Sequence, residues 1–286
     1  MPELPEVETV RRTLAPALGA VIDSAWDSGM GLHMKRKPPR GALKQLVGER
    51  ITALRRHGKY LLVDTDGPAS LLVHLGMTGR LTIHRRTEPR GKHVHVVLGI
   101  TLASPRGGAA GLETRELRFS DARRFGQIDV VDRANERQHP ALAVLGPDAL
   151  VDGVDPLALH AAARKRKSPL KAFILDQSVI AGVGNIYASE ALWRAKLRPT
   201  TRAHKLTAVA AHRLAAAIRE TLLNALENGG TTLQDFVAAD GTKGDNVDYL
   251  WVYDRAGAPC LRCKSLIRRS VLQGRATYYC PRCQLP

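Results

Sequence analysis

Long apolar runs are missing from this chain of 286 residues. The absence of any stretch of about 18 apolar residues excludes a membrane-spanning helix. The first residues carry acids and prolines, whereas a secretory signal would carry basic residues and an apolar run. We therefore expect a cytoplasmic protein. Aromatic residues make up only 5% of the chain, but a hydrophobic share of 44% is enough for a buried core.

Acidic residues are also scarce relative to basic ones. The chain has 27 Asp and Glu against 43 Lys and Arg, a net charge of +16 and a pI of about 10.2. Such an excess favours a polyanionic partner, because phosphate contacts then supply most of the affinity. A solvated surface that serves only solubility is the alternative. We favour nucleic acid, and the excess gathers at residues 35–37, 55–56, 164–167 and 262–275.

Cysteine is absent from the first 259 residues, and all four cysteines lie close to the C-terminal end. They form two Cys-x2-Cys pairs separated by sixteen residues, Cys260 with Cys263 and Cys280 with Cys283. This spacing predicts one tetrahedral zinc site. Two disulfides are the alternative, which a reducing cell interior disfavours. Four sulfur ligands leave no open position for water, so we expect the zinc to be structural.

The region up to about residue 131 predicts one helix followed by short strands. Residues 5–18 have apolar side chains at helical spacing and a proline suited to the first turn. Strands are expected at 60–64, 70–74, 93–98 and 127–131, where β-branched residues are bounded by Gly, Pro and Asp. So many short strands indicate an antiparallel sandwich or barrel. We expect a loop at 105–111.

After residue 148 the composition changes to that of helices. We expect helices at 158–165, 169–176, 185–196 and 207–227, the last one ended by two glycines. The basic residues Arg268, Arg269 and Arg275 lie between the cysteine pairs, in a predicted hairpin suited to DNA. The predicted class is α+β and multidomain. Its domains are a β-domain at 1–133, a linker at 134–152, a helical domain at 153–245 and a zinc finger at 246–286.

The N-terminus is unusual because Met1 is followed by Pro2 and Glu3. Aminopeptidases remove methionine before proline, which would leave a free secondary amine. An α-amine has a pKa of about 8, so more of it is neutral near pH 7 than of a lysine. Joined to a sugar C1′, it would give a permanently charged iminium that promotes elimination of phosphate, and Glu3 would move the proton. A simple helix-capping segment is the alternative.

Six segments together resemble the formamidopyrimidine-DNA glycosylase family, the bacterial enzymes also called 8-oxoguanine DNA glycosylases. They run from the opening PELPEVETVRR to the terminal zinc finger, so the resemblance covers the full length. It implies a β-sandwich, a helix–two-turn–helix domain and a zinc finger, with DNA held between the domains. The other segments are HGKYLL from residue 57, HLGMTG from 74, DARRFG from 121, GVGNIYASE from 182 and GRATYYC from 274.

The resemblance also implies roles for single residues. Pro2 would be the Schiff-base nucleophile, Glu3 the proton donor that helps to open the sugar, and Glu6 a supporting acid. Lys59, placed in a strand, would bind phosphate and assist elimination, and Arg275 would grip the phosphates flanking the lesion. Further DNA contacts would come from His74, Lys171 and Asn185, the last at a helix start where amide groups favour phosphate.

Met77, Arg123 and Phe125 resemble the three residues that fill the gap left by an everted nucleotide, and the neighbouring Arg124 would be a further DNA contact. Base flipping costs a few kcal/mol, and apolar wedges recover part of that cost. Arg123 would hydrogen-bond the orphaned base and so favour cytosine. Taken singly, Met77 and Phe125 would be core residues. In the same way Asn185 would be an N-cap and Lys59 a solvated strand lysine.

Two departures from the family pattern concern loops. Ala122 stands where a proline is usual, which alters loop stiffness. The stretch 240–248 lacks the aromatic residue that many members carry near Asp245 and Asn246, in the loop that closes over 8-oxoguanine. The ranking of substrates therefore does not follow from the sequence.

Three rival functions differ in what they explain. The endonuclease VIII type prefers oxidised pyrimidines, but its members open with Pro-Glu-Gly-Pro-Glu, whereas this chain has Leu4. A damage-binding protein without activity would not need Pro2, Glu3 and Lys59 together. A zinc-ribbon regulator leaves the N-terminus unexplained. We expect a monomeric glycosylase and lyase acting on damaged duplex DNA, without a nucleotide cofactor, in the bacterial cytoplasm at the nucleoid.

Overall fold

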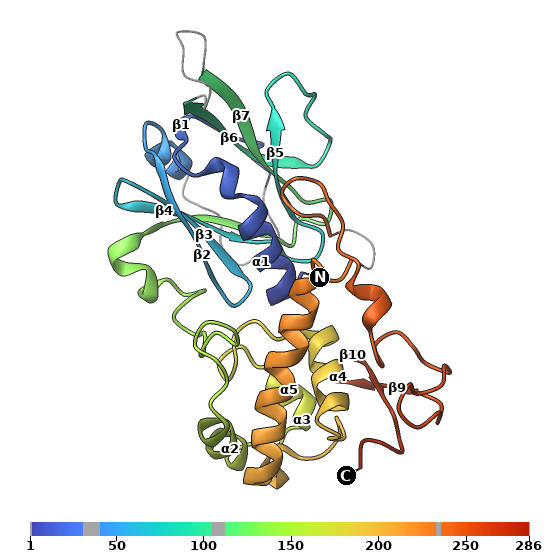
Figure 1. Ribbon diagram of the computed structural model, residues 1–286. Coiled ribbons are helices and arrows are strands. Elements are labelled where there is room, and N and C mark those ends of the chain that lie inside the picture. Colours follow the sequence, from blue (N-terminus) through green and yellow to red (C-terminus); the bar gives the residue numbers. More distant parts are fainter. Residues whose placement is uncertain (1, 31–40, 104–111, 233–235, 286) are drawn as a thin grey trace. The chain divides into compact units, whose positions relative to one another are not determined.

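The structure, a computed structural model, describes residues 2–30, 41–103, 112–232 and 236–285. The basic cluster at 35–37 and the loop expected at 105–111 lie outside these residues. The chain forms two compact units (Figure 1). Unit 1 comprises residues 1–143 and 229–244, and unit 2 comprises residues 144–228 and 245–286.

Unit 1 is the expected antiparallel sandwich with an N-terminal helix. One sheet has the strand order β1-β6-β7-β5 and the other β2-β3-β4-β8, and every pair is antiparallel. Helix α1 spans Leu4–Thr13 and continues into a short 3-10 turn, so the helix expected at 5–18 ends earlier. The strands are β1 (Val21–Asp27), β2 (Ile51–His57), β3 (Tyr60–Thr65), β4 (Ala69–His74), β5 (Arg80–Arg85), β6 (Val94–Ala103), β7 (Leu112–Ser120) and β8 (Gln127–Asp132).

The core of unit 1 lies between the two sheets and under α1. Ile100 and Phe119 reach it from one sheet, Leu61 and Val73 from the other, and all four are fully buried or nearly so. Helix α1 adds apolar side chains spaced at three and four residues, which is the spacing that places them on one helix face. Burial of these faces is the main force that holds the sandwich together.

The stretch 229–244, which the sequence analysis groups with the helical domain, packs instead with unit 1. Phe236 and Ala239 belong to the sandwich core. The hydroxyl of Thr13 accepts a hydrogen bond from the Ala239 amide at 2.9 Å, and Ala239 O accepts one from the Ile83 amide. The stretch has apolar side chains to bury, and α1 and β5 provide the surface that buries them.

Unit 2 contains the expected helices and the C-terminal hairpin. Helix α3 and helix α4 are joined by a turn that the side chain of Gln177 braces, since it donates to Val183 O and accepts from the amide of Gly182. Figure 1 shows the hairpin β9–β10 beside α4. The elements are α2 (Pro156–Arg164), α3 (Leu170–Leu175), α4 (Asn185–Arg194), α5 (Ala208–Glu227), β9 (Arg268–Leu272) and β10 (Arg275–Tyr279).

Among the described residues, no helix combines the length and apolar character that a membrane span requires.

Candidate active site and nucleic-acid interface

The N-terminal residues of unit 1 are held in place by Glu6. Pro2 and Glu3 are both buried. One carboxylate oxygen of Glu6 accepts a hydrogen bond from the Glu3 amide at 2.7 Å, and the other accepts one from the Thr231 amide at 2.7 Å. Gly230 has a φ of +85°, and a side chain there would come within 3.0 Å of Glu6. Glu6 therefore connects the candidate nucleophile to the stretch 229–244.

Lys59 lies in the tight turn between β2 and β3, and not within a strand as expected. Gly58 before it has a φ of +57°, a left-handed conformation that glycine adopts without strain. The lysine is 8% exposed, so it is not the solvated strand lysine of the alternative interpretation. Its position at a turn explains the difference, because the hairpin pairs His57 directly with Tyr60 and leaves only two residues to connect the strands.

A buried ion-pair network ties this turn to α1. The carboxylate of Glu8 accepts hydrogen bonds from Arg11, Arg12 and Arg56. Burial alone would raise the pKa of Glu8, but the hydrogen bonds from the three arginines lower it to about 2. Arg56 also donates to the carbonyl of Gly58 at 3.0 Å. One guanidinium thus connects α1 with the residue that precedes Lys59.

His74 lies at the end of β4, opposite Tyr60 in the neighbouring strand. The two ring centroids are 4.7 Å apart. Burial, with a further contribution from the charge of Lys59, lowers the pKa of His74 to about 4. The imidazole is therefore neutral at pH 7, and its Nδ1 accepts a hydrogen bond from the Gly76 amide at 3.0 Å. Of these two side chains, only Lys59 therefore carries a positive charge at pH 7.

The residues expected to fill the gap in the DNA come together in unit 1. Gly76 lies so close to the next loop that a side chain on it would meet the Phe125 backbone at 2.5 Å. Met77 and Phe125 are each 36% exposed, which excludes the core positions of the alternative interpretation. The guanidinium carbon of Arg123 lies 4.8 Å from the centre of the Phe125 ring. Two apolar side chains and one cation thus project from adjoining loops.

Asp121 fixes the loop that carries these residues. Its carboxylate accepts hydrogen bonds from the amides of Arg123 (3.2 Å) and Gly126 (2.6 Å) and from the hydroxyl of Thr78. Arg124 has a φ of +58°, an uncommon conformation for a residue with a side chain. The tight hydrogen bonding of Asp121 stabilises that conformation. Asp121 therefore links the loop that carries Thr78 to the loop that carries Arg123 and Gly126.

Asn185 is the first residue of α4 in unit 2, and Gly184 is the N-cap, so Asn185 itself is not the cap. The Asn185 amide nitrogen donates to the Tyr253 hydroxyl at 3.4 Å. Its Oδ1 is buried and has no hydrogen-bond partner within the described part of the chain. A polar side chain at the positive end of a helix is well placed to contact an anion.

Glu190, one turn further along α4, holds the segment that carries Tyr253. Its carboxylate accepts hydrogen bonds from the amides of Trp251 (2.8 Å), Val252 (2.9 Å) and Tyr253 (2.8 Å). Complete burial raises the pKa of Glu190 above its usual value, although the three amides oppose that effect. An acid in an otherwise apolar helix face is the sequence signal for such a role, because buried acids are almost always paired.

Lys171 is buried and reaches the finger hairpin. Its Nζ donates to the carbonyl of Ala276 at 2.9 Å and to the hydroxyl of Thr277 at 3.0 Å. Arg275, the residue before Ala276, begins β10 and is exposed. Lys171 therefore attaches α3 to the strand that presents Arg275.

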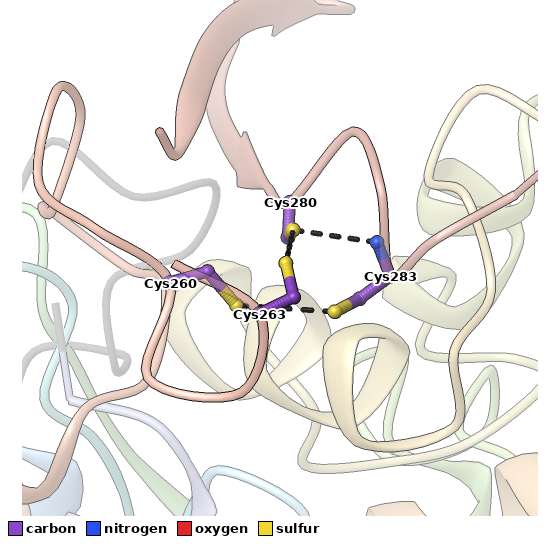
Figure 2. Close-up of side chains that lie close together, drawn as sticks. All are labelled: Cys260, Cys263, Cys280 and Cys283. Carbon is purple, nitrogen blue, oxygen red and sulfur yellow. Dashed lines mark hydrogen bonds between the residues drawn. The ribbon is translucent and has the colours of Figure 1, made fainter. Parts of the chain in front are cut away.

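The four cysteine sulfurs converge at the base of the hairpin, as Figure 2 shows. All four sulfurs lie within 4.8 Å of one another, with 3.4 Å between Cys263 and Cys280 and 3.9 Å between Cys260 and Cys283. A tetrahedral ZnS4 centre with Zn–S bonds of about 2.3 Å has sulfur–sulfur edges of about 3.8 Å. A disulfide needs about 2.05 Å. The spacing therefore fits zinc and does not fit the disulfide alternative.

Two of the basic clusters are less available to DNA than the sequence suggested. Arg55 forms hydrogen bonds with Asp64 and Glu136, and Arg56 is bound to Glu8. Within the cluster at 164–167, Arg166 lies 3.5 Å from an Asp176 oxygen. These arginines offset buried or half-buried acids, so the charge excess overstates the number of phosphate contacts.

Comparison with known proteins assigns the class. The formamidopyrimidine-DNA glycosylase N-terminal domain matches residues 1–128, and the helix–two-turn–helix domain of the same enzymes matches residues 145–237. A zinc finger found in these glycosylases and in IleRS matches residues 257–285. Fold and site together define a DNA glycosylase of base-excision repair with a four-cysteine zinc-binding finger.

Full-length relatives support the same assignment. Formamidopyrimidine-DNA glycosylases of Cereibacter sphaeroides and Methylococcus capsulatus are each 43% identical to this chain, covering 99% of it and 100% of the relative. The crystal structure of the MutM (Fpg) protein from Thermus thermophilus has a TM-score of 0.83 at 39% identity, covering 99% of this chain and 98% of that one. This chain belongs to the formamidopyrimidine-DNA glycosylase family.

The crystal structure of a mutant of Lactococcus lactis Fpg in complex with a Fapy-dG containing DNA is similar as well. Its TM-score is 0.85 at 30% identity, and the match covers 100% of both chains.

Proposed function

We propose that this protein removes oxidised purines, 8-oxoguanine and formamidopyrimidines, from duplex DNA and then cleaves the strand as an apurinic/apyrimidinic lyase. The observation that carries the proposal is the hydrogen-bond arrangement of Glu6, which fixes Glu3 next to a buried Pro2. The similar Lactococcus lactis Fpg, which binds a Fapy-dG containing DNA, supports the purine substrate.

The proposed chemistry uses the secondary amine of Pro2, which requires that Met1 has been removed. The amine attacks C1′ of the damaged nucleotide, and the bond to the base breaks as the base leaves with a proton. Glu3 donates a proton to the ring oxygen as the sugar opens, which gives the iminium. Loss of a C2′ proton then expels the 3′-phosphate, and a second elimination expels the 5′-phosphate. Water finally hydrolyses the iminium and frees Pro2.

Four residues are proposed to hold phosphates of the substrate strand. Lys59 and His74 lie together in unit 1, where one positive charge is present because the His74 ring is neutral. Asn185 at the start of α4 and Arg275 on the hairpin would contact phosphates from unit 2. Lys171 supports this second group by holding β10.

Met77, Arg123 and Phe125 are proposed to occupy the space of the everted nucleotide, with Arg124 contacting DNA beside them. The half-exposed positions of Met77 and Phe125 and the cation above the Phe125 ring support this role. Apolar wedges recover part of the unstacking cost. The guanidinium of Arg123 would then hydrogen-bond the orphaned cytosine. We further propose a monomer with a single structural zinc ion, working without a nucleotide cofactor in the bacterial cytoplasm.

Borohydride trapping on a duplex with 8-oxoguanine opposite cytosine tests the proposal. Processed wild-type protein should give a covalent adduct that mass spectrometry maps to Pro2. Pro2→Gly should lose most of the adduct, and the matched control Pro5→Ala, three residues further on, should keep it. A duplex with an oxidised pyrimidine serves as the comparison substrate.

Trapping only on the pyrimidine duplex would place the activity with the endonuclease VIII type. No adduct on either duplex, with a confirmed free Pro2 and tight DNA binding, would leave a damage-binding protein. Both results contradict the proposal.

A further inference from the structure

Unit 2 contains a cavity that the proposed repair chemistry does not use. Its volume is about 660 Å³. The lining residues come from the start of α3, the segment after α4 and the first turns of α5. Helices α4 and α5, which pack against each other, are labelled in Figure 1.

The charged side chains that line this cavity are basic. Arg198, Arg202, Lys205 and Arg213 line the cavity, and among the described residues no aspartate or glutamate does so. Four cations around one space repel one another unless an anion or solvent separates them. Two of them have partners within the unit, since Arg202 donates to the Lys167 carbonyl and Arg198 lies over the Tyr279 ring. Lys205 and Arg213 are exposed. The cavity therefore favours an anionic ligand.

The N-terminus of α5 adds to this preference. Thr207, the N-cap of the 20-residue helix α5, also lines the cavity, so the positive end of that helix faces the same region.

The cavity is separate from the phosphate contacts proposed for repair in the same unit. Asn185 begins α4, whereas Leu197 and the residues after it follow the end of α4. Ten helical residues span about 15 Å. A single phosphate group is too small to contact both ends of α4.

We propose that this cavity is a second phosphate-binding site, one that accepts phosphate ester groups. The apolar side chains of Leu170, Leu197 and Leu206 would contact the remainder of the ligand, and the cations would bind its phosphates. A free nucleotide and a further segment of nucleic acid carry the same groups. The shared chemistry is the phosphate ester, and the experiment separates the two sources.

The experiment is calorimetric titration of the full-length zinc-loaded protein with pyrophosphate, with dGMP and with a hexathymidylate. Each probe is titrated into the free protein and into protein saturated with a duplex that contains a tetrahydrofuran abasic analogue. The saturated sample masks the repair contacts. If the proposed repair function is wrong and this duplex does not bind, the pyrophosphate titration of the free protein still reports on the cavity.

The variants distinguish binding in the cavity from non-specific attraction of phosphate to a basic protein surface. Lys205→Glu and Arg213→Glu should each weaken pyrophosphate binding by about tenfold, because each removes a charge-assisted contact. The matched control is Arg219→Glu, which makes the same charge change on the exposed face of α5, outside the cavity. The melting temperature of each variant shows whether it is folded.

Losses with the cavity variants, and not with Arg219→Glu, support the site. Tighter binding of dGMP than of hexathymidylate would assign a free nucleotide, and the reverse order a nucleic-acid segment. Equal losses with Arg219→Glu, unchanged binding in folded cavity variants, or no binding of any probe to wild-type protein would overturn the proposal. Excision of 8-oxoguanine without added probe should be the same in all three variants.

Discussion

Arg56 binds Glu8 of α1 and the carbonyl of Gly58 at the same time, at 3.1 Å and 3.0 Å. Its side chain is only 3% exposed. The helix that starts next to Pro2 and the turn that carries Lys59 therefore share one buried guanidinium. Arg56 thus ties the helix beside the proposed nucleophile to the turn that carries a proposed phosphate ligand.

Arg56→Ala should destabilise the protein by about 3 kcal/mol, because it leaves a buried carboxylate with fewer partners. It should also reduce the rate of borohydride trapping, since the turn before Lys59 loses a hydrogen bond. Urea unfolding and trapping kinetics measure the two effects. Arg12→Ala is the matched control, because Arg12 binds the same carboxylate from a 57% exposed position and should cost less than about 1 kcal/mol. Equal effects of the two substitutions would contradict this prediction.

The lowered pKa of His74 predicts a loss of stability in mild acid. Its folded-state pKa of about 4 lies below the unfolded value of 6.5, so the unfolded chain binds more protons between these values. The contribution of His74 to the free energy of unfolding is therefore fully present above pH 6.5. It is lost as the pH drops from 6.5 towards 4, which lowers the free energy of unfolding by up to about 3 kcal/mol. His74→Gln should flatten this part of the unfolding profile, and His212→Gln, at an exposed position, should leave it unchanged. A wild-type profile that is flat from pH 6.5 to 4 would argue against a neutral buried imidazole.

Removal of zinc should unfold the finger, because binding of a structural metal contributes directly to folding. Chelation or Cys263→Ser should release one zinc ion per chain, lower the melting temperature and weaken DNA binding. Metal analysis, calorimetry and DNA titration measure these effects. If the protein bound DNA equally well with and without zinc, the hairpin would have to fold without metal, which would contradict this prediction.

Binding to a lesion duplex should depend strongly on salt. The two charged phosphate ligands, Lys59 and Arg275, predict a slope of about −1.8 for log K against log salt, and Arg275→Ala should reduce its magnitude by about 0.9. Arg219→Ala is the control and should leave the slope unaltered. A wild-type slope near zero would contradict phosphate-dominated binding.

The sequence predicted the helices and the class of the fold well, because apolar spacing and glycine or proline boundaries are local signals. It was weaker for strands with buried charges. In β7, Glu116 and Arg118 are both buried and pair with each other, so the strand lacks a simple alternating pattern. The four cysteines were predicted as one cluster because their spacing alone specifies the convergence.

The sequence predicted which residues form the candidate site, but it did not predict how they are positioned relative to their supporting hydrogen-bond partners. Lys59 was expected in a strand, since nothing in the sequence shows where β2 ends. The packing of 229–244 with unit 1 depends on contacts with Glu6 and Thr13, more than 200 positions earlier in the chain. The supporting roles of Glu190 and Gln177 arise from hydrogen bonds to distant backbone amides or to a turn, which no local pattern records.

The hydrogen bond between Glu6 and Thr231 also determines when unit 1 can finish folding during synthesis. Pro2 is among the first residues to leave the ribosome, whereas Thr231 and the core residue Phe236 follow more than 200 residues later. At about 5–20 residues per second, that interval lasts on the order of 10–50 s. A nascent chain therefore carries the candidate nucleophile for most of its synthesis without the segment that fixes it. Ribosome-bound fragments should accordingly be inert towards damaged DNA until unit 1 has closed.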